Sequence, residues 1–271
     1  MVSKRCSYGI ACCRLISDGP QVLMVKKRYT YSYFDFIMGR YKGINDIVRL
    51  QYLFNNMTFH EKLDILNCDF EKMWYRIWLG SPEKEKKENG YFKNLTSYKF
   101  NNSKTLNTPN LDRIYKSKKK RFESNFGNQY GKDRLRDMIN HSTSSEKVWE
   151  IPKGGKKGIE KPMDTAIREF NEETNLMTKN YYIYFDIKPK VESYIDGGTL
   201  WKNIYYIAEI NEVYKEPKLD FFSHQVNEIE AIKWVGFRDI EFLDLNNKTK
   251  KRVKKFLKHL FYIYKKARSE I

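Results

Sequence analysis

GGKKGIEKPMDTAIREFNEETNL, residues 154–176, is the most informative stretch of this chain. A helix is expected from about Met163 to Thr174, and it places Glu169, Glu172 and Glu173 at i, i+3 and i+4 on one face. Three carboxylates this close repel one another, so the helix gains no stability from them. Divalent cations relieve the repulsion, because these hard ions prefer oxygen ligands. The stretch therefore predicts a metal-binding helix.

The simpler interpretation is a solvated acidic helix face, which is what most E-x-x-E-E strings are. Two further features favour a site. Ala166, Ile167 and Phe170 can pack the opposite side of the helix against a core. Ahead of the helix, the loop Pro152–Gly155 contains glycines that allow the backbone to approach a phosphate closely.

The whole segment resembles the Nudix box, Gly-x5-Glu-x7-Arg-Glu-apolar-x-Glu-Glu-x-Gly-apolar, at every fixed position but one. The exception is Asn175, which stands where the box has glycine. Asparagine tolerates left-handed backbone geometry better than other non-glycine residues, so the helix can still end there. The resemblance implies a Nudix hydrolase that cleaves a phosphoanhydride bond. It also implies an α/β fold of the α+β Nudix type, with a mixed sheet between helices.

The resemblance further implies roles for individual residues. Glu169, Glu172 and Glu173 would be catalytic and would bind Mg²⁺ or Mn²⁺, with the backbone carbonyl of Lys153 as a further ligand. The supporting residues would be Gly154, Glu160 and Arg168, with Arg168 pairing with a carboxylate. Nudix enzymes often add a carboxylate from outside the box as base or ligand. Glu228 is the best match for it, and Glu230 is the alternative.

Strand patterns lie on both sides of a helical region. Residues 7–16 and 21–27 predict a hairpin around the turn Ser17–Pro20. Strands return at 148–152, 181–186, 191–195, 201–210 and 229–235, and Thr249–Arg268 has the apolar period of a closing helix. The region between has helical spacing and an Asn- and Lys-rich, polar segment. We therefore predict a Nudix core from residues 1–36 and 142–271, and a mostly helical insertion at 37–141 with a loop at about 81–110.

A narrower resemblance covers most of the chain. It is carried by Phe54–Thr58, Asp69–Trp78, Lys27–Tyr29, Trp149–Gly154 and Ser193–Gly197. These stretches resemble viral mRNA-decapping Nudix hydrolases of large cytoplasmic DNA viruses, of the asfarvirus, poxvirus and mimivirus type. The resemblance implies capped mRNA as substrate and activated water as nucleophile. The products would be 7-methylguanosine diphosphate and 5′-monophosphate RNA, and the place of action the host cytoplasm.

The charge balance favours an anionic partner. Lys and Arg number 51 against 34 Asp and Glu, a net charge of +17, which attracts polyanions. One dense cluster is predicted to bind RNA: Lys116, Lys118, Lys119, Lys120 and Arg121. For the basic C-terminal helix, RNA contact and a solvated face are equally good interpretations. Tyr33, Phe34, Phe36 and Tyr194 are candidates for stacking on the cap base, but core packing explains each as well, and no pair is assigned.

Other functions remain open from the sequence. A Nudix box does not specify the substrate, so a diphosphoinositol polyphosphate or a nucleotide is the alternative substrate. A non-catalytic RNA-binding module is a second alternative, although the three clustered glutamates argue against it. The four cysteines lack zinc-ligand spacing and are expected to be reduced thiols. Neither a signal peptide nor an apolar run of roughly 20 residues is seen, so we expect a soluble intracellular protein without a transmembrane segment.

Overall fold

The computed structural model describes residues 3–78, 108–196, 198–211, 217, 219, 228–245 and 247–269. The chain forms two compact units. The first, called the sheet unit here, is Met1–Arg28 with Lys147–Ile271, and the second, the helical unit, is Tyr29–Glu146. The Asn- and Lys-rich loop predicted at about 81–110 lies outside the described residues, except that its last three positions belong to a helix.

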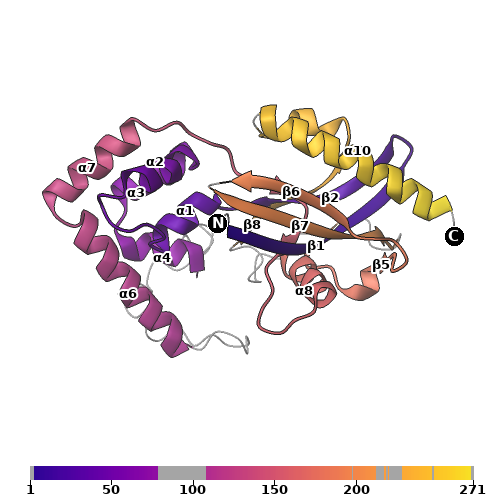
Figure 1. Cartoon of the computed structure of the whole chain (residues 1–271), viewed down its shortest axis with the longest axis horizontal. Coiled ribbons are helices and arrows are strands. Elements are labelled where there is room, and N and C mark those ends of the chain that lie inside the picture. The colour runs from indigo at the N-terminus through magenta and orange to yellow at the C-terminus, as the bar shows by residue number, and fades with distance from the viewer. Residues whose placement is uncertain are drawn as a thin grey trace. The chain divides into compact units, whose positions relative to one another are not determined.

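The sheet unit contains a mixed eight-stranded sheet (Figure 1). Its strands are β1 (Ser3–Ile16), β2 (Gly19–Lys27), β3 (Trp149–Glu150), β4 (Lys153–Gly154), β5 (Tyr181–Ile183), β6 (Lys190–Asp196), β7 (Thr199–Ile210) and β8 (Ile229–Gly236). β1 and β2 form the predicted hairpin, with Ile16 opposite Gly19. β1 runs parallel to β7, and the other pairs are antiparallel.

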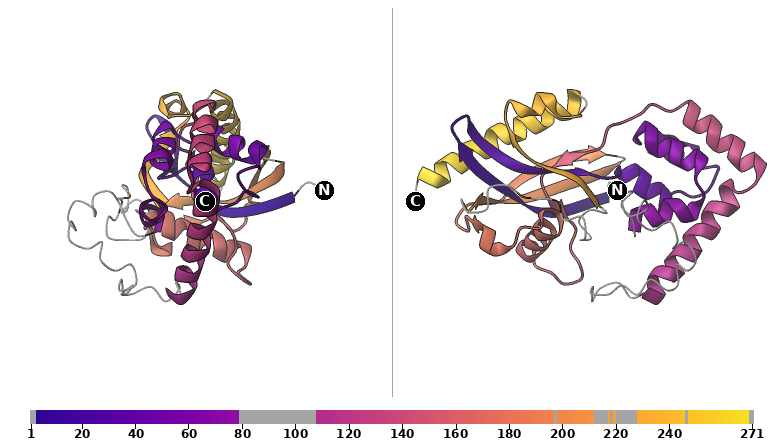
Figure 2. Two further views of the ribbon diagram at one scale, coloured as in Figure 1. Left: turned by 90° about the vertical axis from the view of Figure 1, so that its left-hand side faces the viewer. Right: turned by 180° about the vertical axis from the view of Figure 1, so that it is seen from behind.

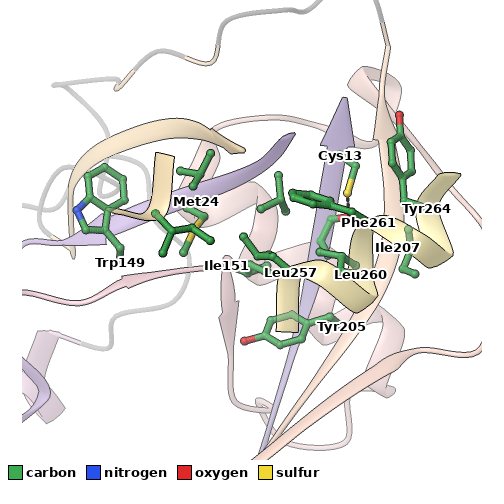
Figure 3. Close-up of a cluster of buried hydrophobic side chains, with 14 of the residues drawn as sticks. Cys13, Met24, Trp149, Ile151, Tyr205, Ile207, Leu257, Leu260, Phe261 and Tyr264 are labelled. Carbon is green, nitrogen blue, oxygen red and sulfur yellow. Dashed lines mark hydrogen bonds between the residues drawn. The ribbon is translucent and has the colours of Figure 1, made fainter. Parts of the chain in front are cut away.

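Two helices cover opposite faces of this sheet, α8 (Pro162–Thr174) and α10 (Asn247–Ser269) (Figures 1 and 2). Successive side chains of a strand point to opposite faces. Accordingly, Cys13 of β1 packs in the cluster with α10 that Figure 3 shows, whereas its neighbour Cys12 packs in the cluster with α8. The predicted mixed sheet between helices is confirmed, and both clusters bury apolar surface against it. Two short 3₁₀ turns, η1 (Thr178–Asn180) and η2 (Asp239–Phe242), complete the described elements.

The regular elements in the described part of the helical unit are all helices. They are α1 (Tyr31–Ile37), α2 (Ile47–Asn55), α3 (Phe59–Asn67), α4 (Phe70–Trp78), α6 (Thr108–Phe126) and α7 (Gln129–Asn140). Their core is rich in buried aromatic side chains, including Phe36, Phe54, Trp74 and Phe126. Thr58 caps α3 and forms a capping box with Glu61, which satisfies two backbone donors at the helix start.

The limits of the units differ from the predicted ones by a few residues. The helical unit begins at Tyr29, rather than after residue 36, because Tyr33 and Phe36 of α1 are buried in its core. It extends to Glu146, since the backbone of Ser145 is still hydrogen bonded to Met57. Within the described residues, no helix has both the length and the apolar character to cross a membrane.

Candidate active site

Helix α8 carries the acidic face, and its ends are set by local sequence. Pro162 is its first residue, where the fixed φ of proline suits a helix and the missing N–H is not needed. Ala166 and Phe170 are fully buried against the sheet. The helix ends at Asn175, whose φ of 57° is left-handed. The asparagine therefore performs the chain-reversing role that glycine has in the Nudix box.

The two glycines before α8 differ in their surroundings. Gly154 belongs to β4, which pairs with β1, and a Cβ atom built on it would collide with the carboxyl group of Glu169. A Cβ on Gly155 would meet nothing within 4 Å. Gly154 thus makes room for the Glu169 carboxylate, and Gly155 has no such steric role.

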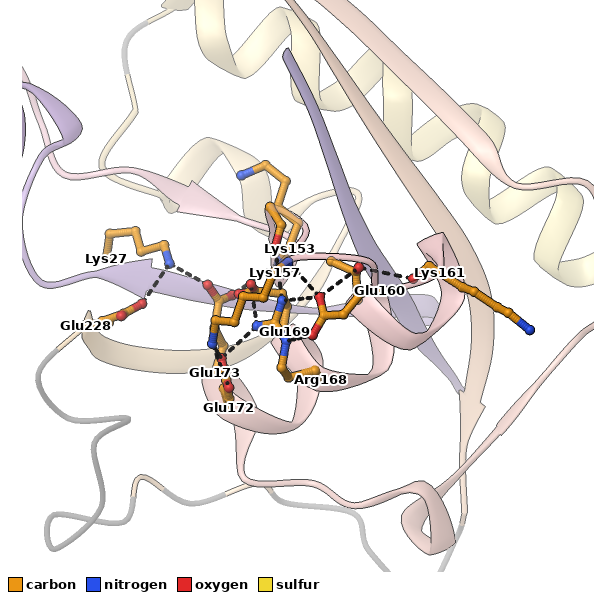
Figure 4. Close-up of polar contacts among 12 residues, drawn as sticks. Lys27, Lys153, Lys157, Glu160, Lys161, Arg168, Glu169, Glu172, Glu173 and Glu228 are labelled. Atoms are coloured by element: carbon orange, nitrogen blue, oxygen red, sulfur yellow. Dashed lines mark hydrogen bonds and ion pairs between the residues drawn. The ribbon is translucent and has the colours of Figure 1, made fainter. Parts of the chain in front are cut away.

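Arg168 connects the loop and the helix through several charge-assisted hydrogen bonds (Figure 4). Its Nε donates to one carboxylate oxygen of Glu160 at 2.7 Å, and a terminal nitrogen donates to the other at 2.9 Å. The same terminal nitrogen donates to the Gly155 carbonyl at 3.0 Å. The other terminal nitrogen donates to Glu169 at 2.6 Å and to Glu172 at 3.0 Å. Hydrogen bonds from Arg168 and from a backbone N–H lower the pKa of Glu160 to about 2. Such bidentate contacts fix position as well as charge.

Glu173 is the most buried of the three acidic residues, with a side chain only 3% exposed. One of its carboxylate oxygens accepts a hydrogen bond from the ammonium group of Lys27, and the other accepts one from the Lys153 backbone N–H at 3.2 Å. Burial raises the pKa of Glu173, and the adjacent Lys27 ammonium opposes that rise. The carboxylate is therefore held in one orientation inside the site.

Two residues next to Glu173 were not identified from the sequence as part of the site, Lys27 and Glu150. The Glu150 side chain is 10% exposed and contacts the ammonium group of Lys153; one of its oxygens lies 3.9 Å from Lys27 Nζ. Both residues lie in stretches that carry the viral resemblance, Lys27–Tyr29 and Trp149–Gly154. That coincidence was the only signal, because neither residue stands near the box in a spacing that predicts contact.

A β-bulge places Glu228 and Glu230 beside different lysines. Lys26 lies opposite Ala231, and a regular antiparallel register would place Glu230 opposite Lys27. The register instead shifts and places Ile229 there. A carboxylate oxygen of Glu228 consequently lies 3.9 Å from Lys27 Nζ, whereas Glu230 pairs with Lys26 and Lys147. Of the two candidate carboxylates outside the box, Glu228 is thus the one that lies beside Lys27, the partner of Glu173.

The donor set suits a hard divalent cation. The acidic side chains supply oxygen ligands only, and those of Glu172 and Glu228 are 50% and 72% exposed and therefore accessible. In the described residues, no group of three or more His, Cys, Asp or Glu is already arranged around a metal position. Basic side chains contact the carboxylates instead: Arg168, Lys157 and Lys27. The carboxylate oxygens fit a hard divalent cation that would replace these basic side chains as their partner.

The predicted RNA-binding cluster lies on α6 of the helical unit. Lys116 and Lys120 are exposed, whereas Lys118 and Lys119 are half-buried and Lys119 lies 3.7 Å from Glu71. Arg121 donates to the Tyr41 carbonyl and lies over its ring, so it has an internal structural role.

The four aromatic candidates for cap stacking differ in how deeply they are buried. Tyr33 and Phe36 are buried in the helical core, whereas Phe34 and Tyr194 are only partly buried. Tyr194 belongs to the sheet unit, and the Arg252 guanidinium lies 4.4 Å from its ring centroid.

Comparisons with known proteins identify the family of this chain. Residues 136–260 match the model of the NUDIX domain. The mRNA-decapping protein g5R of African swine fever virus is 30% identical over 243 residues, which cover 88% of this chain and 87% of that protein. A putative mRNA-decapping protein of Acanthamoeba polyphaga mimivirus is 24% identical, over 79% of this chain and 58% of its own length.

Among solved structures, the C. elegans Ap4A hydrolase binary complex is 24% identical and covers 41% of this chain and 76% of its own, with a TM-score of 0.32. The chain belongs to the Nudix hydrolases, on the domain match and the nearly full-length viral relatives together. It is accordingly a phosphoanhydride hydrolase, as the box predicts.

Proposed function

We propose that this protein removes the 5′ cap of mRNA, releasing 7-methylguanosine diphosphate and 5′-monophosphate RNA. The observation that carries the proposal is the extent of the similarity to viral decapping proteins. It covers 88% of the chain, whereas the NUDIX match is confined to residues 136–260 and leaves out most of the helical unit. A substrate shared with those relatives explains why the helical unit is shared as well. We place the activity in the host cytoplasm, where capped mRNA is translated.

The sheet unit supplies the chemistry in this proposal. Glu169, Glu172 and Glu173 would hold Mg²⁺ or Mn²⁺, together with the backbone carbonyl of Lys153. When bound, the metal supplies positive charge to the triphosphate bridge and makes water a stronger nucleophile. Arg168 keeps the loop and the helix in register. Glu228, which is exposed and lies beside the Glu173–Lys27 pair, accepts the proton of the attacking water.

The helical unit supplies affinity for the RNA chain in this proposal. Lys116 and Lys120 present exposed charge from α6, and Lys118 and Lys119 lie between them with partly exposed side chains. Phosphate contacts of this kind give affinity without sequence preference. Arg121 contributes through the fold of the unit, because its guanidinium already contacts Tyr41.

One comparison of substrates tests the proposal. The protein and Mn²⁺ would be incubated with cap-labelled RNA, free cap dinucleotide and a diphosphoinositol polyphosphate, and turnover compared. We expect the capped RNA to be cleaved with the highest kcat/KM and labelled 7-methylguanosine diphosphate to be released. Faster turnover of the inositol substrate would show that the protein is a diphosphoinositol polyphosphate hydrolase instead. RNA binding without turnover of any substrate would indicate the non-catalytic module.

A further inference from the structure

Lys27 is a buried lysine at one side of the acidic site, next to Glu173 and Glu228 (Figure 4). Its ammonium contacts Glu173 and lies 3.9 Å from carboxylate oxygens of both Glu150 and Glu228, and its side chain is only 11% exposed. Lysine is rarely buried unless it is paired. The three carboxylates come from α8, from β3 and from the residue before β8, so the tertiary structure builds a site for one cation around this nitrogen.

The bulge in β8 completes the group of carboxylates around Lys27. It places Ile229 opposite Lys27 and brings Glu228 to its side. Bulges occur next to active sites, where they change the direction of a side chain. The preceding residue, Lys26, points to the other face and pairs with Glu230 and Asp244. Two adjacent lysines of one strand therefore face two separate acidic groups.

We propose that the ammonium group of Lys27 occupies the place of a cation beside Glu173 and so weakens divalent-metal binding until a polyphosphate substrate is present. The inference rests on the proposed function, in which Glu173 is a metal ligand. A divalent ion that approaches Glu173 meets the positive charge of Lys27. The phosphates of the substrate supply negative charge that offsets this repulsion and give the ammonium another partner.

Electrostatics, rather than support of Glu173, is the main effect that Lys27 has on the metal. Glu173 is also held by the Lys153 backbone N–H at 3.2 Å, a contact that side-chain substitution of Lys27 leaves in place. The ammonium of Lys153 contacts Glu150, so that carboxylate too keeps a counter-ion. Removing the charge of Lys27 therefore leaves the other partners of both carboxylates and takes away the repulsion.

The test measures Mn²⁺ affinity by electron paramagnetic resonance, with and without a methylene-bridged cap dinucleotide that cannot be hydrolysed. Lys27→Met removes the charge at similar length, and Lys26→Met is the matched control on the other face of β2. For Lys27→Met we expect the Kd of Mn²⁺ alone to fall at least about tenfold. That scale follows from charges of +1 and +2 about 4 Å apart even with water-like screening. The cap analogue should then tighten Mn²⁺ binding less in Lys27→Met than in the wild type.

Lys27→Gln keeps a hydrogen-bond donor for Glu173 without the charge, and it decides the question if Lys27→Met does not fold in a thermal melt. An unchanged or weaker Mn²⁺ affinity in the folded variant overturns the inference, and so does an equal gain in Lys26→Met. Glu173→Gln separates the two levels of the argument. If Glu173→Gln binds Mn²⁺ as the wild type does, the metal assignment of the proposed function is wrong. If Glu173→Gln binds Mn²⁺ more weakly, Glu173 is a metal ligand, and the Lys27 variants then test the role of Lys27 alone.

Discussion

Helices α8 and α6 are both densely charged, but they use charge differently. The three glutamates on the acidic face of α8 each contact a basic side chain: Glu169 and Glu172 contact Arg168, and Glu173 contacts Lys27. On α6, Lys116 and Lys120 are exposed, and Lys116 has only a surface ion pair with Asp112 at 2.9 Å, while Phe122 on the other side packs against Phe70. Catalysis needs groups fixed to a fraction of an ångström, whereas attraction for a phosphate chain tolerates mobile side chains. We therefore expect a single substitution on α8 to cause a large loss of turnover, and each substitution on α6 to cause a small loss of RNA affinity.

The largest expected effect is that of Glu173→Gln on α8. We expect turnover of capped RNA to fall roughly 10²- to 10⁴-fold, the scale of general acid–base and metal contributions. RNA affinity, measured by fluorescence anisotropy, should stay near the wild-type value. Glu230→Gln is the matched control, because the bulge directs that carboxylate to Lys26 and Lys147 instead. Near-normal turnover by Glu173→Gln would remove the catalytic assignment of α8.

A smaller but still abrupt effect is expected from Gly154→Ala. The added methyl group would occupy the place of the Glu169 carboxyl group, which sits at the end of a flexible side chain and can move away. Turnover should therefore fall by about tenfold or more, on the scale of disturbed ligand positioning, while the melting temperature changes little. Gly155→Ala meets nothing within 4 Å and should keep its activity. Equal losses in both variants would show that Glu169 does not need this space.

A moderate loss of RNA affinity is expected when both exposed lysines of α6, Lys116 and Lys120, are replaced by Ala. If each contacts one phosphate, the slope of log affinity against log salt should lose about 1.4 in magnitude, from about 0.7 per contact on single strands. Hydrolysis of a free cap dinucleotide should change little. Lys132→Ala, an exposed lysine on α7, is a control for general charge. A slope identical to the wild type would turn attention to α10, where Lys251, Lys255 and Lys258 are exposed.

The smallest effect concerns pH and the contact between Glu160 and Arg168. The pKa of Glu160 is lowered to about 2 in the folded protein, from 4.5 as its ordinary value. A depressed acid pKa stabilises the fold above about pH 4.5, and this contribution is lost as the pH falls toward 2. The urea midpoint of the wild type should therefore exceed that of Glu160→Gln by a constant amount from pH 8 to pH 5, and the gap should narrow below pH 4.5. A gap that does not depend on pH would mean that the charge of Glu160 contributes nothing.

The sequence by itself was enough to predict the helices and strands that depend on interactions between residues close together in the chain. The spacing of Glu169, Glu172 and Glu173 predicts one helix face, and the tolerance of asparagine for positive φ predicts the helix end at Asn175, which the structure places at a φ of 57°. Alternation of apolar residues predicts the hairpin and the long strands. The period of α10 likewise follows from its own residues, because amphipathic patterns depend only on neighbours three and four positions away.

Only the tertiary structure decided which distant residues meet. Lys27 and Glu173 are far apart in the chain, and so are Glu150 and Glu228, yet the sheet brings all four together. The choice between Glu228 and Glu230 depended on one bulge between β2 and β8, which no periodicity of either strand reveals. Arg121 and Phe36, which suggested RNA or cap contacts, are used inside the helical unit. A sequence pattern records which side chains share a face; the three-dimensional packing determines what that face contacts.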